Sequence, residues 1–154
     1  MTTYSRLWFL SFVMLVMFSC SDSAQPVEIQ PSPIDLNNAV VIKSGTFTGQ
    51  NSYITSGSVQ ILRAQDGSHF LKTGEDFRVD GGAGSISIWL SKSSANLQVG
   101  NSAANIKLGT IQSRFSGVYT YSIPAPELLD FTHVVTFCDG ARVNFGFSQL
   151  KNPE

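Results

Sequence analysis

Short runs in which apolar and polar residues alternate fill the chain from Lys43 to Leu150, and this pattern restricts the fold more than any other feature. Alternation with a period of two residues is typical of β-strands that turn one face toward a core. The clearest runs are Ile86–Leu90 and Val143–Phe147, and Gly, Asn, Asp and Ser separate the runs from one another. The pattern predicts nine strands, at residues 44–50, 57–65, 68–73, 76–80, 85–91, 105–111, 117–123, 131–138 and 142–149.

Turn residues also favour an all-β domain. Asp66-Gly67 joins two of the runs and is a strong signal for a tight hairpin turn. Pro124 and Pro126 restrict any helix in their segment to a single turn. Eight or nine strands in one domain require two packed sheets or a closed barrel, and we predict an antiparallel β-sandwich. The residues predicted for its core are Phe47, Val59, Ile61, Phe70, Phe77, Ile86, Ile88, Leu90, Ile106, Leu108, Tyr119, Tyr121, Phe137, Val143, Phe145 and Phe147.

Residues 1–19 have the pattern of a signal peptide. Arg6 supplies a positive charge, and the stretch Leu7–Phe18 is apolar apart from one serine. This stretch is shorter than the roughly 20 residues that a membrane-spanning helix needs. Because Ser19-Cys20 follows directly and resembles a lipobox, we predict lipidation of Cys20. An ordinary secretory signal that leaves Cys20 free is the alternative.

The segment after Cys20 is predicted to be a tether. Its prolines, Pro26, Pro31 and Pro33, favour extended backbone and give no helix. A lipid on Cys20 predicts a protein of the bacterial cell envelope, anchored to a membrane and facing the periplasm or the cell surface. The predicted organisation is a signal peptide at 1–19, a tether at 20–42, a β-sandwich domain at 43–150 and a tail at 151–154.

The charge balance excludes nucleic acid as a partner. The chain has 10 Lys and Arg residues against 11 Asp and Glu residues, and its formal net charge is −1. These charges form no basic stripe of the kind that nucleic-acid binding requires. The expected partners are therefore the membrane, through the lipid anchor, and a redox or protein partner that the sequence does not identify.

The predicted domain has few side chains suited to catalysis or metal binding. Its histidines are His69 and His133, and Cys138 is its only cysteine. Two His and one Cys match the ligand count of a trigonal copper site, but His133 and Cys138 are five residues apart in one strand and should face opposite sides. No Gly-x-Ser-x-Gly motif marks a nucleophile. We predict no metal site and no catalytic residues, favour a protein that is not an enzyme, and leave the cofactor unknown.

Cys138 allows two interpretations. As a small apolar residue it would be buried in the core, which is usual for free cysteine. Alternatively, it is a reactive thiol at the end of a strand, beside a turn and Arg142, whose positive charge would favour the thiolate. Because Cys20 is expected to carry lipid, Cys138 has no disulfide partner within the chain. Redox chemistry would then need a partner thiol, a bound centre or radical transfer.

Several segments between Gly45 and Leu150 occur in the order found in one known domain family. They are Gly45–Gln50, Ser56–Val59, Ile86–Ser91, Leu108-Gly109, Ser116-Gly117, Tyr121–Pro124, Val134–Cys138 and Val143–Gly146. Over this stretch the chain resembles the DM-thirteen domain, also called the electron-transfer DM domain. The resemblance implies an extracytoplasmic β-sandwich, which occurs alone in bacterial lipoproteins, and a redox or electron-transfer role around Cys138.

Two classes of function follow from these observations. The first is a membrane-tethered sandwich with a redox-linked role centred on Cys138 and tuned by Arg142, which predicts an accessible thiol. The second is a non-catalytic binding or adhesion module of the cell surface. In that module Trp89, Tyr53, Tyr119 and the loops rich in Asn and Ser would form an exposed contact surface, and Cys138 would be buried.

Overall fold

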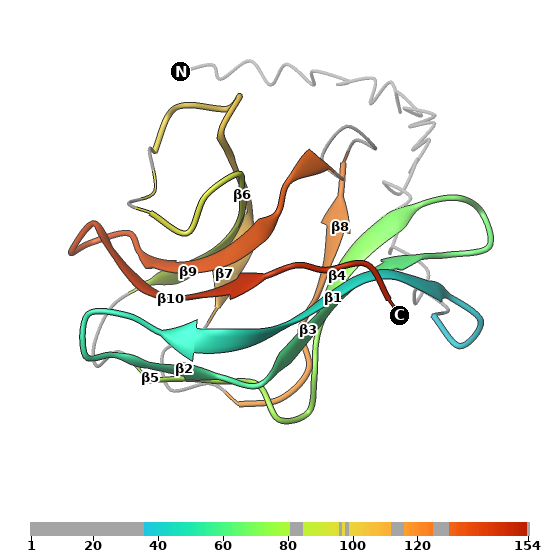
Figure 1. Ribbon diagram of the computed structural model, residues 1–154, viewed down its shortest axis with the longest axis horizontal. Coiled ribbons are helices and arrows are strands. Elements are labelled where there is room, and N and C mark those ends of the chain that lie inside the picture. Colours follow the sequence, from blue (N-terminus) through green and yellow to red (C-terminus); the bar gives the residue numbers. More distant parts are fainter. Residues whose placement is uncertain are drawn as a thin grey trace, which may run out of the picture. The chain divides into compact units, whose positions relative to one another are not determined.

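The described part of the computed structural model is all-β (Figure 1). It covers residues 36–80, 85–95, 97, 99–111, 116–124 and 130–153, so the predicted signal peptide and Cys20 lie outside it. None of the described residues belongs to a helix that could cross a membrane. The ten strands are β1 (Val40–Gly49), β2 (Ile54–Ser56), β3 (Ser58–Arg63), β4 (His69–Thr73), β5 (Arg78–Asp80), β6 (Ile86–Ser91), β7 (Asn105–Ile111), β8 (Thr120–Ile123), β9 (His133–Cys138) and β10 (Val143–Gln149).

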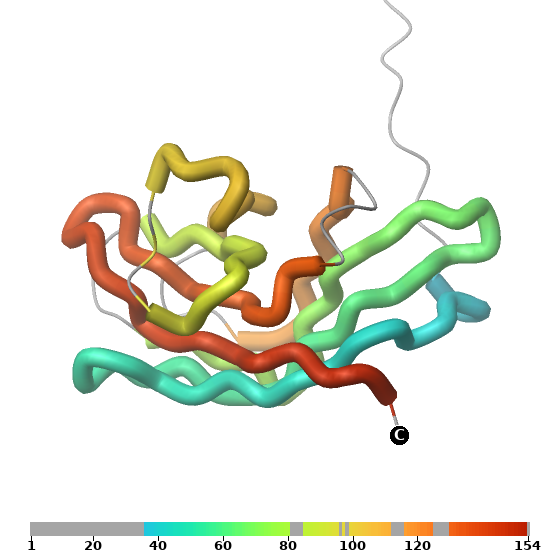
Figure 2. The backbone as a smooth tube through the Cα atoms, turned by 45° about the horizontal axis from the view of Figure 1, so that its top comes forward, coloured from blue at the N-terminus to red at the C-terminus, as the bar shows by residue number. Residues whose placement is uncertain are grey.

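Eight of the strands form one continuous antiparallel sheet in the order β7-β6-β9-β10-β1-β3-β4-β8. The long strand β1 joins the two halves of this sheet, because Val40–Thr46 pair with β3 whereas Phe47–Gly49 pair with β10. Strands that pass from one sheet to the other form the corners of orthogonal sandwiches. Figure 2 shows β1 running between β10 and β3. The prediction of an antiparallel all-β fold is confirmed, with β1 shared by its two layers.

The edge strands β7 and β8 approach each other and nearly close the sheet into a barrel. The Tyr121 ring of β8 covers Gly109 of β7, and the Tyr121 hydroxyl donates a hydrogen bond to the Thr110 carbonyl oxygen over 3.2 Å. A Cβ atom at residue 109 would lie 2.7 Å from Cδ1 of Tyr121, so the ring fits there because residue 109 is glycine. Partial burial, and secondarily Tyr119, raise the pKa of Tyr121. This contact covers edges that would otherwise be open to pairing with another chain.

The interior of the barrel is one apolar cluster. Most residues predicted for the core lie in this cluster or pack against it, and Phe77, Ile61 and Leu90 are fully buried there. Burial of side chains of this size contributes about 1.5–3 kcal/mol each to stability. The interior is therefore filled by side chains and holds the strands of both layers together.

A second apolar cluster lies on the outer face of β6, β9 and β10. It consists of Trp89, Leu97, Val135 and Phe137, with Phe147 packed against it. The alternating pattern predicted Phe147 on the same face as Phe145, and this is wrong. A β-bulge between Asn144 and Gly146 inserts one residue into β10 and turns Phe147 to the opposite face.

The segment that follows β6 covers this outer cluster. Leu97 packs into the cluster, and the Asn144 side-chain amide donates a hydrogen bond to the Ala95 carbonyl oxygen over 3.1 Å. The Gln50 side-chain amide donates to the carbonyl oxygen of Ser94 over 3.4 Å. Both faces of β6 and β9 are consequently buried, which explains why these strands carry apolar residues on both faces.

The described residues form one strand more than the sequence predicts, because β2 precedes Gly57. Gly57 has a φ of 95°, which lies in the left-handed region that favours glycine. A side chain at this position would also meet the backbone of Asp76 and Phe77. The chain therefore turns at Gly57, and β2 pairs with β5 in a separate two-stranded sheet. Strand β1 begins at Val40, within the segment predicted as a tether.

Candidate functional site

Cys138 is the last residue of β9 and points into the barrel. Its cross-strand neighbours are Ile86 of β6 and Val143 of β10. Only 4% of its surface is exposed, and it belongs to the interior apolar cluster. The thiol is thus a buried group at the end of a strand, and the expectation of an accessible thiol is not met in this conformation.

The turn Asp139–Arg142 lies directly beside the thiol. The Ala141 backbone N–H donates a hydrogen bond to Cys138 Sγ over 3.4 Å, and the Arg142 N–H donates to the Cys138 carbonyl oxygen over 2.8 Å. Arg142 has a φ of 55°, and a non-glycine residue in this region costs of order 1–3 kcal/mol. Gly140, Ala141 and Arg142 are exposed. The sulfur is therefore packed in the interior cluster and contacted by one exposed turn.

Arg142 contacts Cys138 through its backbone N–H and not through its side chain. Among the described residues, no hydrogen bond or ion pair joins the Arg142 guanidinium to Cys138. The guanidinium instead lies on an exposed part of the turn.

A chain of hydrogen-bonded side chains lies on the outer face next to the same turn. The Trp89 indole N–H donates to Ser87 Oγ over 2.7 Å, and the Ser87 hydroxyl donates to Asp139 Oδ1 over 2.8 Å. The other carboxylate oxygen of Asp139 pairs with Lys107 Nζ at 2.8 Å. The Lys107 ammonium also lies 5.9 Å from the centre of the Trp89 ring. These hydrogen bonds connect the buried Trp89 indole to the Lys107–Asp139 ion pair at the surface.

The sequence pattern does not predict this network of hydrogen-bonded side chains. Ser87 and Trp89 are two residues apart on one strand face, which is a local signal, but Asp139 and Lys107 come from β9's turn and from β7. Only the pairing of β6 with both β7 and β9 brings the four together. The Trp89 indole N–H was the one sequence signal for this network, because a buried indole N–H needs a hydrogen-bond acceptor.

The exposed aromatic surface expected for a binding module is not formed by the predicted residues. Trp89 is only 7% exposed, because the outer cluster surrounds it. Tyr53 stacks on Phe145 with 3.9 Å between ring centres, and Tyr119 stacks on Tyr121 at 5.9 Å. The prediction that Trp89 contributes to a contact surface is therefore wrong, and the two tyrosines pack against the core.

The two faces of β9 separate the candidate copper ligands. Cys138 lies in the interior, whereas His133 packs against Phe147 on the outer face with 6.0 Å between ring centres. His133 Nδ1 is 2.9 Å from the Thr132 hydroxyl, and partial burial lowers the pKa of His133. Within the described ranges, no three His, Cys, Asp or Glu residues are grouped so that they could hold a metal ion.

Comparison with known proteins identifies the class of protein. Residues 46–150 match the family model described as electron transfer DM13. Because the match covers more than half of the 154 residues, the chain belongs to this family, and the resemblance predicted from the sequence is confirmed. Membership indicates a role related to electron transfer. No curated protein and no solved structure matches the chain significantly.

Proposed function

We propose that this protein is a lipid-anchored electron-transfer module of the bacterial cell envelope, in which Cys138 is the redox-linked residue. The observation that carries the proposal is the position of Cys138. It is the only cysteine in the part of the chain that matches the electron-transfer family, and it lies in the barrel wall beside an exposed turn.

Burial of the thiol favours one-electron chemistry over thiol–disulfide exchange. Exchange requires an attacking sulfur to make contact with the thiol or its disulfide, and the 4% exposure of Cys138 obstructs that contact. An electron can leave a buried group without such contact. The shielded position of Cys138 is therefore compatible with electron transfer to a partner docked on the Asp139–Arg142 turn.

The proposed step removes one electron and one proton from the Cys138 thiol. The S–H bond of Cys138 breaks, one electron passes to a one-electron metal centre in a partner protein, and the proton passes to solvent at the turn. The return of one electron and one proton restores the thiol. Three charged side chains near the turn, Lys107, Asp139 and Arg142, would orient the partner through complementary charge.

The anchor is the second part of the proposal. Cys20 follows the apolar stretch of the predicted signal peptide, and two acyl chains on it would bind a bilayer stably, at about 0.8 kcal/mol for each buried CH₂ group. The prolines of the following segment would keep the domain away from the lipid surface. Lipidation predicts that cells given an alkyne fatty acid label the wild-type chain but not a Cys20→Ala variant.

Coulometric titration of the full chain in lipid vesicles, with soluble one-electron mediators, tests the redox role. We expect the wild-type chain to give up and recover a single electron per chain. A Cys138→Val variant, which keeps an apolar side chain in the interior, should lose this electron. A Cys20→Ser variant should keep it and thus controls for the second cysteine. An equal electron count for the wild type and Cys138→Val would refute the role of Cys138.

The non-catalytic binding module is the second candidate, and the burial of Cys138 is the observation that favours it. In that case Cys138 would serve only to pack the interior, and the titration would find no electron that depends on it. The two candidate functions therefore differ in the number of electrons per chain that depend on Cys138.

A further inference from the structure

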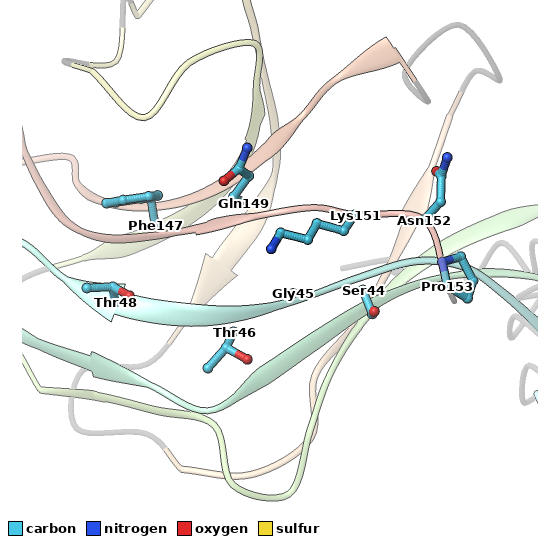
Figure 3. A pocket seen from close by; sticks show the side chains of 9 residues that line it. All are labelled: Ser44, Gly45, Thr46, Thr48, Phe147, Gln149, Lys151, Asn152 and Pro153. Atoms are coloured by element: carbon cyan, nitrogen blue, oxygen red, sulfur yellow. The ribbon is translucent and has the colours of Figure 1, made fainter.

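A polar groove runs along the outer face of β1 and β10 (Figure 3). Its volume is about 470 Å³, within the range of about 300–1,000 Å³ typical of small-ligand sites. The groove is separate from the interior that contains Cys138. The residues that line it are Ser44, Gly45, Thr46, Thr48, Phe147, Gln149, Lys151, Asn152 and Pro153.

The pairing of β1 with β10 places these side chains on one surface. Ser44 pairs with Lys151, and Thr48 pairs with Phe147. Because alternate residues of a strand share a face, every second residue from Ser44 to Thr48 and from Phe147 to Lys151 faces the groove. Gly45 allows the two strands to lie close, since a Cβ there would meet Ser148 Oγ and the Gln149 carbonyl oxygen.

The backbone under the groove is already paired. The Ser44 N–H donates to the Lys151 carbonyl oxygen over 2.8 Å, and the Lys151 N–H donates to the Ser44 carbonyl oxygen over 2.8 Å. An extended peptide therefore cannot add to these strands through main-chain hydrogen bonds. Recognition in the groove must come from side chains.

The lining side chains are mostly hydrogen-bonding groups with one positive charge. Hydroxyls come from β1, the amides of Gln149 and Asn152 come from the C-terminal part, and Phe147 supplies a ring. None of the described residues that line the groove is acidic. This combination suits a ligand with many hydroxyl groups, an apolar ring face and a negative charge.

Lys151 is the charged group available to such a ligand. In the part of the chain that the structure describes, its ammonium has no ion pair, whereas Lys107 pairs with Asp139 and Arg78 with Asp80. Figure 3 shows the Lys151 side chain extended along the groove toward its middle. A carboxylate in the groove would therefore meet an ammonium that pairs with no described acidic residue.

We propose that this groove binds an acidic saccharide. The sugar carboxylate pairs with Lys151, the hydroxyl and amide side chains bind the sugar hydroxyls, and the apolar face of a sugar ring lies against Phe147. A single positive charge gives a modest affinity that decreases with salt. The site is independent of the electron-transfer proposal, because none of its residues contacts Cys138.

NMR titration of the ¹⁵N-labelled full chain in detergent micelles tests the proposal, with trigalacturonate as the probe. We expect shifts at the amides of Gln149, Lys151 and Asn152. Lys151→Gln should weaken binding about fivefold, the size of one exposed ion pair. Lys92→Gln, which removes an exposed charge outside the groove, should leave the affinity unchanged.

Two further probes decide the class of ligand. Galactotriose, which lacks the carboxylates, should bind more weakly than trigalacturonate and should be insensitive to Lys151→Gln. A tri-glutamate peptide should bind more weakly too, because it lacks the ring hydroxyls. The proposal is overturned if trigalacturonate shifts no groove amide, if Lys151→Gln leaves its affinity unchanged, or if tri-glutamate binds as tightly.

Discussion

Replacing Gly109 by alanine tests how the barrel closes. The new Cβ would lie 2.7 Å from Cδ1 of Tyr121, whereas carbon atoms in contact prefer about 3.5–4.0 Å, so the ring must move by about 1 Å. Overpacking of this kind costs about 1–3 kcal/mol. A compatible Gly→Ala change gains about 0.4–1 kcal/mol through the unfolded state, and Gly109 has no positive φ that would prevent this gain. We expect a net loss of about 1–2 kcal/mol.

Urea unfolding of four variants measures this effect. In a Tyr121→Ala background the ring is absent, so Gly109→Ala should become neutral or stabilise the protein by about 0.4–1 kcal/mol. The difference between backgrounds, about 1–3 kcal/mol, is the coupling energy of the two residues. Gly140→Ala is the matched control, because a Cβ there would have no neighbour within 4 Å. Equal effects of Gly109→Ala in both backgrounds would refute closure through this contact.

Three further outcomes follow from the structure. In the Cys20→Ser chain, Cys138 should be alkylated slowly in the folded protein and fast after unfolding in urea, because only 4% of its surface is exposed. Fast alkylation of the folded protein would contradict its burial. Ser87→Ala should cost about 1–3 kcal/mol in urea unfolding, since it leaves the buried Trp89 N–H unpaired; an unchanged midpoint would contradict this. Because the pKa of His133 is lowered in the folded state, the unfolded chain takes up this proton at a higher pH, and the free energy of unfolding should fall as the pH drops below about 6.5. His133→Gln should reduce this dependence of the free energy of unfolding on pH. The same pH dependence in the wild type and in His133→Gln would contradict this.

Local sequence signals were sufficient for nine of the ten described strands, all but β2, and for most of the core. Alternation and turn residues are short-range patterns, so Ile86–Leu90 and Val143–Gln149 were placed correctly. A bulge is different, because the sequence does not show which residue is left without a partner. The alternating pattern therefore missed the reversal between Phe145 and Phe147.

The candidate site was predicted only in part, because it depends on contacts between distant segments. The sequence marked Cys138 as the one cysteine of the domain, but its burial follows from the pairing of β9 with β6 and β10. The same pairing brings Asp139 to Ser87 across 52 residues of sequence. No single-strand pattern contains that information.

The pH dependence of the midpoint potential of the electron that depends on Cys138 is the most direct test of the central claim. If the thiol loses its proton together with the electron, the buried site is uncharged before and after the step. The potential should then fall by about 59 mV for each pH unit. A potential that does not change with pH, or a wave that persists in Cys138→Val, would contradict proton-coupled electron transfer at this residue.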